Sequence, residues 1–393
     1  MLPLLSIALG AFVIGTEGFM LAGLLPGLSS DLGVSIAAAG QLVTVFSLTF
    51  ALGAPVLAVA TGSVDRKRLL LGAMVVFALG NLLAARAHDY GMLVAARITM
   101  AVAASAFMPA ASAYAVAAVG PERRGRAISV IYVGLTLATV LGSPLGVLLG
   151  GRFGWRTTFV VVAALTAVAV GGMWRMLAPQ AAARAATPGE QLAAARRPDV
   201  LGTLVLSVLS QVGIFALYTY LAPFLAEAVG VTGSGVAAVL FLFGAGGAVG
   251  NLVGGAAADR FRSRRLLAAI FVLLSLAGRA LPMPVRLPVV VALILLWGGI
   301  MCAFPSVQQT RLVRIDPRLA AVTLSLNASA IYLGISLGAA VGAVAVVHLG
   351  ALSLGFVASA CELVALAALR IAPDVAPAGG EAAGLSRRVA TGE

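Results

Sequence analysis

The chain has 393 residues, of which 61% are hydrophobic and only 10% charged, and its mean hydropathy is +1.07. This balance lies far outside that of soluble domains and excludes a large soluble catalytic or binding domain. The formal net charge of +12 would suggest a nucleic-acid partner in a soluble protein. In a chain this apolar, the positions of the positive residues indicate membrane topology instead, so no nucleic-acid partner is expected.

Apolar stretches separated by short loops follow one another along almost the whole chain. A bilayer core of about 30 Å is crossed by roughly 20 helical residues, so each stretch predicts a transmembrane helix in a lipid bilayer. The prediction is an all-α polytopic membrane protein with twelve spans, near 3–28, 37–61, 69–87, 91–118, 127–150, 157–177, 200–228, 235–258, 266–281, 288–313, 320–347 and 351–371. The ninth span is short, because Arg279 and the run Pro282, Pro284 and Pro288 interrupt its end, and this leaves an eleven-span alternative.

Arginine and lysine are unevenly divided between the two sets of loops. Nineteen of the 26 fall on the loops after spans two, four, six, eight and ten or after the last span, and Arg97 and Arg311 fall within or at the edge of spans. The other side holds five, which are Arg86, Arg152, Arg156, Arg279 and Arg286. Because positive residues accumulate on cytoplasmic loops, both termini are predicted to lie in the cytoplasm.

The two halves of the sequence are similar to each other. An offset of 200 residues aligns Ser129, Ile131, Tyr132, Gly134 and Gly142 with Ser329, Ile331, Tyr332, Gly334 and Gly342. The predicted organisation is an N-terminal six-helix bundle over 1–177, a cytoplasmic linker over 178–199, a C-terminal six-helix bundle over 200–371 and a cytoplasmic tail over 372–393. Two parallel halves with a substrate site between them near the midplane are typical of one class of secondary transporter.

Three passages carry distinctive patterns: Gly15 to Pro26 in span one, Leu93 to Arg97 in span four, and Gly134 to Gly151 in span five. Together they resemble the major facilitator superfamily, and within it the bacterial drug and sugar efflux branch of proton antiporters. The resemblance implies two pseudo-symmetric six-helix halves, alternating access, and export of a small organic compound in exchange for protons. It also implies a bacterial cytoplasmic (inner) membrane, no cofactor, and a monomer. A proton-independent facilitator, an importer and a membrane sensor stay open, and so does the cargo.

Two ionisable residues fall at similar depths in the predicted spans. Glu17 lies about 14 residues, or roughly 21 Å, from the cytoplasmic start of span one, and Arg97 about 6 residues, or roughly 9 Å, from the external start of span four. A charge in hydrocarbon costs at least about a few kcal/mol and needs a partner. We therefore predict a Glu17–Arg97 pair that acts in proton coupling, with a purely structural pair as the alternative. Glu362 in span twelve is assigned a structural role.

Two basic turns follow spans two and eight, with Asp65-Arg66 in the first and Asp259-Arg260 in the second. They resemble the superfamily's loop between helices two and three. There an acid caps a helix start and pairs with arginines, forming a latch that breaks as the halves rock. An ordinary basic topology loop is the alternative.

Span five contains the glycine and proline passage. Gly142 and Gly146 allow neighbouring helices to approach closely, and Pro144 removes a backbone hydrogen bond, which predicts a kink or weak point. Simple tight packing is the alternative. The resemblance further implies that spans one, four, seven and ten line the passage. The polar cavity candidates there are Gln211, Tyr218, Tyr220, Gln308 and Gln309.

Other chemistry finds little support in the sequence. His88 and His348 are not accompanied by clustered Cys, Asp or Glu, so no metal site is predicted. Cys302 and Cys361 both fall in predicted spans and indicate buried thiols rather than a disulfide scaffold. No glycine-rich phosphate loop with a following lysine is present, so ATP is not the expected energy source. A membrane enzyme is the distant alternative.

Overall fold

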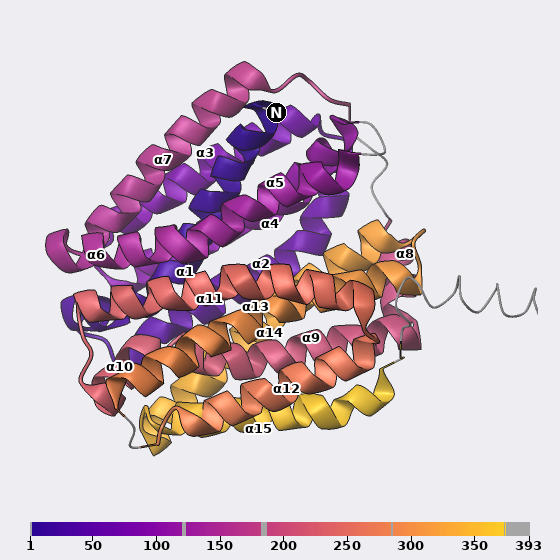
Figure 1. The fold of residues 1–393 in the computed structure, drawn as a ribbon. Coiled ribbons are helices and arrows are strands. Elements are labelled where there is room, and N and C mark those ends of the chain that lie inside the picture. The colour runs from indigo at the N-terminus through magenta and orange to yellow at the C-terminus, as the bar shows by residue number, and fades with distance from the viewer. Residues whose placement is uncertain (1, 120–122, 182–186, 284–285, 373, 375–393) are drawn as a thin grey trace, which may run out of the picture.

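The computed structural model describes residues 2–119, 123–181, 187–283, 286–372 and 374, and this part of the chain is helical without strands (Figure 1). Most of the predicted tail and part of the predicted linker lie outside the described residues. The helices are α1 (Leu2–Leu32), α2 (Ile36–Ala60), α3 (Arg66–Ala85), α4 (Tyr90–Ala117), α5 (Arg124–Leu137), η2 (Ala138–Gly142), α6 (Ser143–Phe153), α7 (Trp155–Met176), α8 (Pro188–Arg196), α9 (Pro198–Tyr218), α10 (Leu221–Val229), α11 (Ser234–Arg260), α12 (Ser263–Ala280), α13 (Leu287–Ile315), α14 (Ala320–Leu349), α15 (Ser353–Ala368) and η3 (Leu369–Ile371).

Ten spans are long and apolar enough to cross a membrane, counting Gly125–Phe153 as one. Two shorter helices, α12 with 18 residues and α15 with 16, occupy the positions of the predicted ninth and twelfth spans. The prediction of an all-α, twelve-span membrane fold is thus confirmed. Helix α12 is present at the predicted ninth span, which the eleven-span alternative omits.

The helices form two groups, which Figure 1 shows as an upper set from α1 to α7 and a lower set from α9 to α15. In the first, α1 packs on α5 and α7, and α3 packs on α4. In the second, α9 packs on α14, α11 on α13, and α12 on α15. The groups meet where α2 runs along α14 and where α11 packs on η2 and α6. The expected boundaries of the two bundles stay a prediction.

Two predicted spans are interrupted, and a proline accounts for each interruption. In span five, the turn η2 is a π-helix in which the Ser143 amide donates to the Ala138 carbonyl, directly before Pro144. In span seven, α9 ends at Tyr218 and α10 begins at Leu221. Pro223 has no amide hydrogen to donate to the carbonyl four residues earlier, so the helix cannot continue through Thr219 unchanged.

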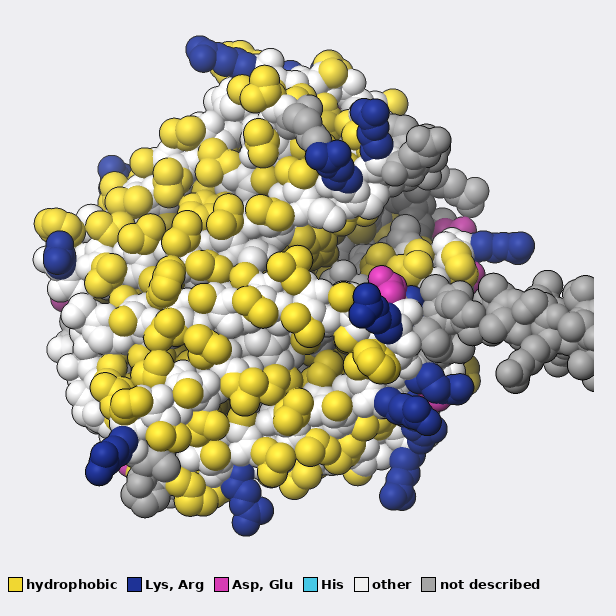
Figure 2. All heavy atoms as spheres, viewed as in Figure 1, with side chains coloured by type: hydrophobic (Ala, Val, Ile, Leu, Met, Phe, Trp, Pro, Cys, Tyr) yellow, Lys and Arg dark blue, Asp and Glu magenta, His cyan; other side chains and the backbone are white. Residues whose placement is uncertain are grey.

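The two ends of the helix bundle differ in charge. At one end α3, α5 and α9 begin and α11 and α13 end, and the loops there contain most of the arginines. We call it the arginine-rich end, and its partner the opposite end. Figure 2 shows a face dominated by hydrophobic side chains with Lys and Arg at its margins, as expected for a surface in contact with lipid.

Candidate functional site

Glu17 and Arg97 form an ion pair inside the N-terminal group of helices. Glu17 comes from α1 and Arg97 from α4, and their side chains are 0% and 1% exposed. Arg97 Nη1 donates a hydrogen bond to Glu17 Oε1. The structure therefore brings together the two residues that the sequence singles out by depth. Their role in proton coupling stays a prediction.

The remainder of the Arg97 guanidinium is held by α2. Its Nε donates to the backbone carbonyl of Leu42 at 3.1 Å, and its Cζ lies 4.4 Å from the ring centroid of Phe46, within cation–π range. Glu17 Oε2 has no hydrogen-bond partner in the described part of the chain. The sequence offered no signal for Leu42 or Phe46, because an aromatic residue in an apolar span is common and the rotation of α2 is set by packing.

Aromatic side chains from both helix groups meet where the groups face each other. We call this set, Phe19, Phe215, Tyr218, Phe243 and Trp297, the aromatic layer. Tyr218 donates to the backbone carbonyl of Phe19 at 3.2 Å, and the two rings meet edge to face with centroids 5.8 Å apart. Phe243 lies 5.0 Å from Tyr218 and 5.5 Å from Trp297. Tyr218, a predicted cavity residue, therefore bridges the two helix groups.

Tyr220 has a different environment from Tyr218. Its hydroxyl donates to the Ala339 carbonyl of α14 at 3.0 Å, and its ring packs against Gly342. A Cβ on Gly40 of α2 would overlap the Tyr220 phenol, so this glycine gives the tyrosine its space. Tyr220 thus belongs to the packing between α2 and α14.

The three predicted glutamines also differ in their surroundings. Gln308 is buried, and its Nε2 donates to the Thr203 carbonyl at 3.0 Å and to Ser207 Oγ at 3.1 Å. Gln309 is half-buried and lies beside Tyr132 of the other helix group. Gln211 is buried, and its Oε1 has no partner in the described residues. Gln308 Oε1 likewise has no partner there, but the Gln308 amide nitrogen is held by α9.

Glu362 is a second buried carboxyl within the membrane-spanning helices. It lies on α15, is 1% exposed, and both its oxygens accept from Ser210 Oγ of α9, at 3.3 and 3.4 Å. These contacts lie within the C-terminal helix group, unlike those of the aromatic layer. The structural role that the sequence suggests for Glu362 stays a prediction.

Comparison with known proteins identifies the family. The family model described as Major Facilitator Superfamily matches residues 7–339 and 203–385. The chain belongs to this superfamily. It is 34% identical over 341 residues to the Escherichia coli (strain K12) inner membrane transport protein YdhP, covering 86% of this chain and 87% of the relative. It is also 34% identical over 352 residues to the Streptomyces lividans chloramphenicol resistance protein, covering 88% and 90%.

The fold is similar to that of a solved transporter structure. A crystal structure of a bacterial homologue of the human lysosomal transporter Spinster, in an inward-facing and occupied conformation, matches with a TM-score of 0.73 and 17% identity, covering 94% of this chain and 93% of that one. The family match and the transporter relatives identify the protein as a multi-pass membrane transporter of the superfamily and not an enzyme. The two basic turns and the glycines of span five join or space pairs of its packed helices.

Asp65 caps α3 and holds the segment that follows α7. Its Oδ1 accepts from the Arg68 amide at 2.9 Å and its Oδ2 from the Gln180 amide at 2.8 Å, while the Arg66 amide donates to the Gln180 carbonyl at 3.0 Å. The hydrogen bond from the Arg68 amide holds the pKa of Asp65 below its usual value. Within the described part of this transporter, the acid of the first basic turn thus binds backbone amides rather than an arginine side chain.

The second turn has the expected acid–arginine contact. Asp259 Oδ1 accepts from Arg314 Nη2 at 3.0 Å, and Arg314 Nη1 donates to the Ala258 carbonyl at 2.9 Å. Arg260 is exposed at the last turn of α11. Both ties join α11 to α13 within the C-terminal group.

The glycines of span five allow α1 to approach closely. A Cβ on Gly142 would overlap the Thr16 side chain, and one on Gly146 would lie 3.0 Å from Met20 Cβ. Pro144 lies within the first turn of α6, directly after the π-helical turn. The predicted irregularity is present as this π-helical turn, packed between α1 and α11.

Proposed function

We propose that this protein exports a small organic compound across a bacterial cytoplasmic membrane by alternating access, in exchange for protons. The observation that carries the proposal is the buried Glu17–Arg97 pair. Ionisable groups inside a membrane are costly and are retained chiefly where they bind ions or substrates. Glu17 is the proton site, because its Oε2 has no protein partner in the described residues and a bound proton would cancel its attraction for Arg97.

The ion pair is linked to the contact between the helix groups. Arg97 holds α2 through Leu42 and Phe46, and α2 faces α14 of the other group. On that face Phe50 stacks on Tyr332 with centroids 3.6 Å apart. Protonation of Glu17 releases Arg97, and Arg97 then shifts α2 against α14. In this way a proton on one side chain biases the arrangement of the two halves.

The direction of transport and the substrate contacts are proposed from several separate features. The excess of arginine at one end supports a cytoplasmic position for both termini, since positive residues accumulate on cytoplasmic loops. Export, rather than uptake, is supported by the similarity to a protein named for chloramphenicol resistance. We assign substrate contacts to Tyr218, Gln211 and Gln309, and regard Gln308 and Tyr220 as residues that shape the walls around them. A monomer suffices, since both halves come from one chain.

Purified protein in proteoliposomes tests the proposal. A pH-sensitive dye inside the vesicles reports proton movement while a panel of drugs and sugars is added across an imposed proton gradient. We expect a compound-dependent proton flux that is lost in Glu17→Gln and kept in Glu362→Gln, the matched change at the other buried acid. Compound flux without protons would favour the facilitator, and unchanged flux in Glu17→Gln would exclude Glu17 as the proton site.

A further inference from the structure

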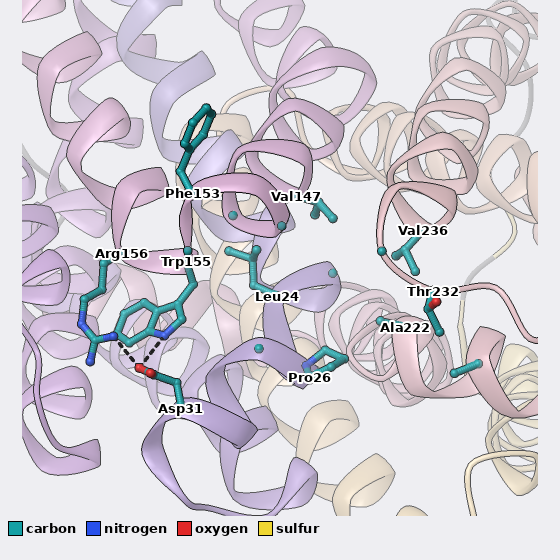
Figure 3. Close-up of a pocket in the computed structure, with 17 residues that line it drawn as sticks. Leu24, Pro26, Asp31, Val147, Phe153, Trp155, Arg156, Ala222, Thr232 and Val236 are labelled. Atoms are coloured by element: carbon teal, nitrogen blue, oxygen red, sulfur yellow. Dashed lines mark hydrogen bonds and ion pairs between the residues drawn. The ribbon is translucent and has the colours of Figure 1, made fainter.

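A cavity of about 520 Å³ lies between the two helix groups at the opposite end of the bundle (Figure 3). Its walls come from α1, α6 and α7 on one side and from α10 and α11 on the other. Its volume falls in the range of small-molecule sites in proteins. No residue of the Glu17–Arg97 pair or of the aromatic layer lines it.

The cavity is separated from the ion pair along α1. Leu24, Gly27 and Asp31 line it, and they follow Phe19 by about 5 to 12 residues, or roughly 8 to 18 Å of helix. Between them and Glu17, Phe19 contacts Tyr218 of the other group. The aromatic layer therefore lies between the buried carboxyl and this cavity, and the cavity lies on the side from which exported cargo would leave.

One wall of the cavity carries a fixed polar cluster. Trp155 Nε1 donates to Asp31 Oδ2 at 3.0 Å, and Arg156 Nη1 donates to the same oxygen. Arg156 is held in turn by the Ala87 carbonyl, which accepts from Nε at 3.0 Å and from Nη2 at 2.7 Å. Because both contacts use Oδ2, Asp31 Oδ1 is available to accept another hydrogen bond. The charges of Asp31 and Arg156 cancel, so the cluster does not attract a net ion.

The remaining walls are apolar and open. Leu24, Val147 and Val236 supply aliphatic surface (Figure 3). Gly27 of α1 and Gly151 of α6 line the cavity without any heavy atom within 4 Å of an added Cβ. A Cβ at either position would therefore meet open space at the cavity wall. These glycines keep the cavity empty enough for a ligand.

We propose that this cavity is a second ligand site, for uncharged and mainly apolar compounds that carry one hydrogen-bond donor. The aliphatic walls receive the apolar body, and Asp31 Oδ1 accepts from the donor. We further propose that exported cargo occupies the cavity after passing the aromatic layer, and this second step rests on the proposed export function. The binding site itself does not.

Tryptophan fluorescence tests the site without any transport. Trp155 lines the cavity, and 4-nitrobenzyl alcohol is an uncharged nitroaromatic quencher with one hydroxyl donor. We expect saturable quenching in wild type. In Gly151→Leu the affinity falls by about tenfold or more, because the leucine fills the cavity. The control is Gly72→Leu on α3, where an added Cβ also meets nothing within 4 Å. Linear quenching that is the same in all three proteins would overturn the proposal.

Two further probes test the ligand chemistry. 4-Nitrotoluene lacks the donor and is expected to bind about tenfold more weakly, the loss of one hydrogen bond to a charged acceptor. Equal affinity would overturn the assignment to Asp31. In proteoliposomes, Gly151→Leu is expected to slow export of a transported compound while Gly72→Leu does not. Saturable quenching with unchanged export would keep the site and refute its role in the exit path, whatever the result for Glu17→Gln.

Discussion

Removal of one member of the Glu17–Arg97 pair leaves the other charge buried without compensation. Breaking a buried pair in this way costs about 3–5 kcal/mol of folding free energy. Arg97→Met also gives up the bond to the Leu42 carbonyl and the contact with Phe46, so its cost falls in the upper part of that range. Glu17→Gln retains a carbonyl oxygen that can accept from Arg97, so its cost falls near about 3 kcal/mol.

The double variant separates the pair from its surroundings. Glu17→Gln combined with Arg97→Met removes both charges, and uncharged replacements of a buried pair are often close to neutral. We expect the double variant to lie within about 2 kcal/mol of wild type, and the coupling energy to exceed about 2 kcal/mol. The measurement is reversible unfolding in mixed micelles of a mild detergent and dodecyl sulfate at neutral pH. Glu362→Gln provides the control, since its carboxyl faces Ser210 and no arginine.

The refuting result is additivity. If the losses of the two single variants sum to the loss of the double variant within about 0.5 kcal/mol, the residues do not stabilise each other. Burial of each side chain would then have to be explained separately, and the proposed release of Arg97 by a proton on Glu17 would lose its energetic basis.

Three other regions give predictions of their own. Asp65→Ala is expected to cost about 1 kcal/mol of folding free energy at pH 7, because it removes the cap of α3. The pKa of Asp65 is lowered in the folded protein, so the difference in thermal stability between wild type and variant narrows as pH falls below about 4. A difference that stays constant with pH would contradict the assignment. Gly142→Ala is expected to lower the melting temperature, because the added Cβ overlaps α1. Gly18→Ala is expected to leave it unchanged, because a Cβ there meets nothing within 4 Å. Equal shifts in melting temperature for the two variants would refute the close approach of α1 at Gly142. Thr44 and Ser336 exchange hydrogen bonds between α2 and α14, so cysteines at both positions can form a disulfide across the two halves. In a cysteine-free background, oxidation of Thr44→Cys/Ser336→Cys is expected to stop transport until a reductant is added. Full transport by the cross-linked protein would refute the rocking of the halves.

The fold was largely predictable, because bilayer thickness imposes one length on every span. The depth of Glu17 and Arg97 along their helices also predicted their contact, since rise per residue is fixed. Rotation about the helix axis is not fixed in this way, so the sequence did not reveal that Phe46 meets Arg97. The same limit applies to Tyr218 and Tyr220, which adjoin a helix break and reach different neighbours.

Some local features were missed although the sequence contained a signal for them. Helix α8 lies inside the predicted linker, where Thr187 and Glu190 form a capping box. The break of span seven follows from Pro223, which the prediction of one continuous span did not take into account. The partner of Asp65 could not be predicted, because Gln180 is more than 100 residues away in sequence and binds through its backbone.

The distribution of contacts indicates which of them must break when the two helix groups move relative to each other. At the arginine-rich end, the Asp65–Gln180 and Asp259–Arg314 ties each stay within one helix group. Arg197 binds Asp199 and Asp316, again within the C-terminal group, and this contact lowers the pKa of Asp316. These ties therefore need not break as the halves rock, and they keep each half rigid.

Contacts between the groups lie deeper in the bundle and toward the opposite end. They include Phe50 with Tyr332, Thr44 with Ser336, and Tyr218 with Phe19. Opening the opposite end requires these three contacts to separate, each a weak contact of roughly 0.5–1.5 kcal/mol. A change of about that size at one buried charge would therefore be comparable to the cost of the movement, as the proposal of Glu17 as the proton site requires.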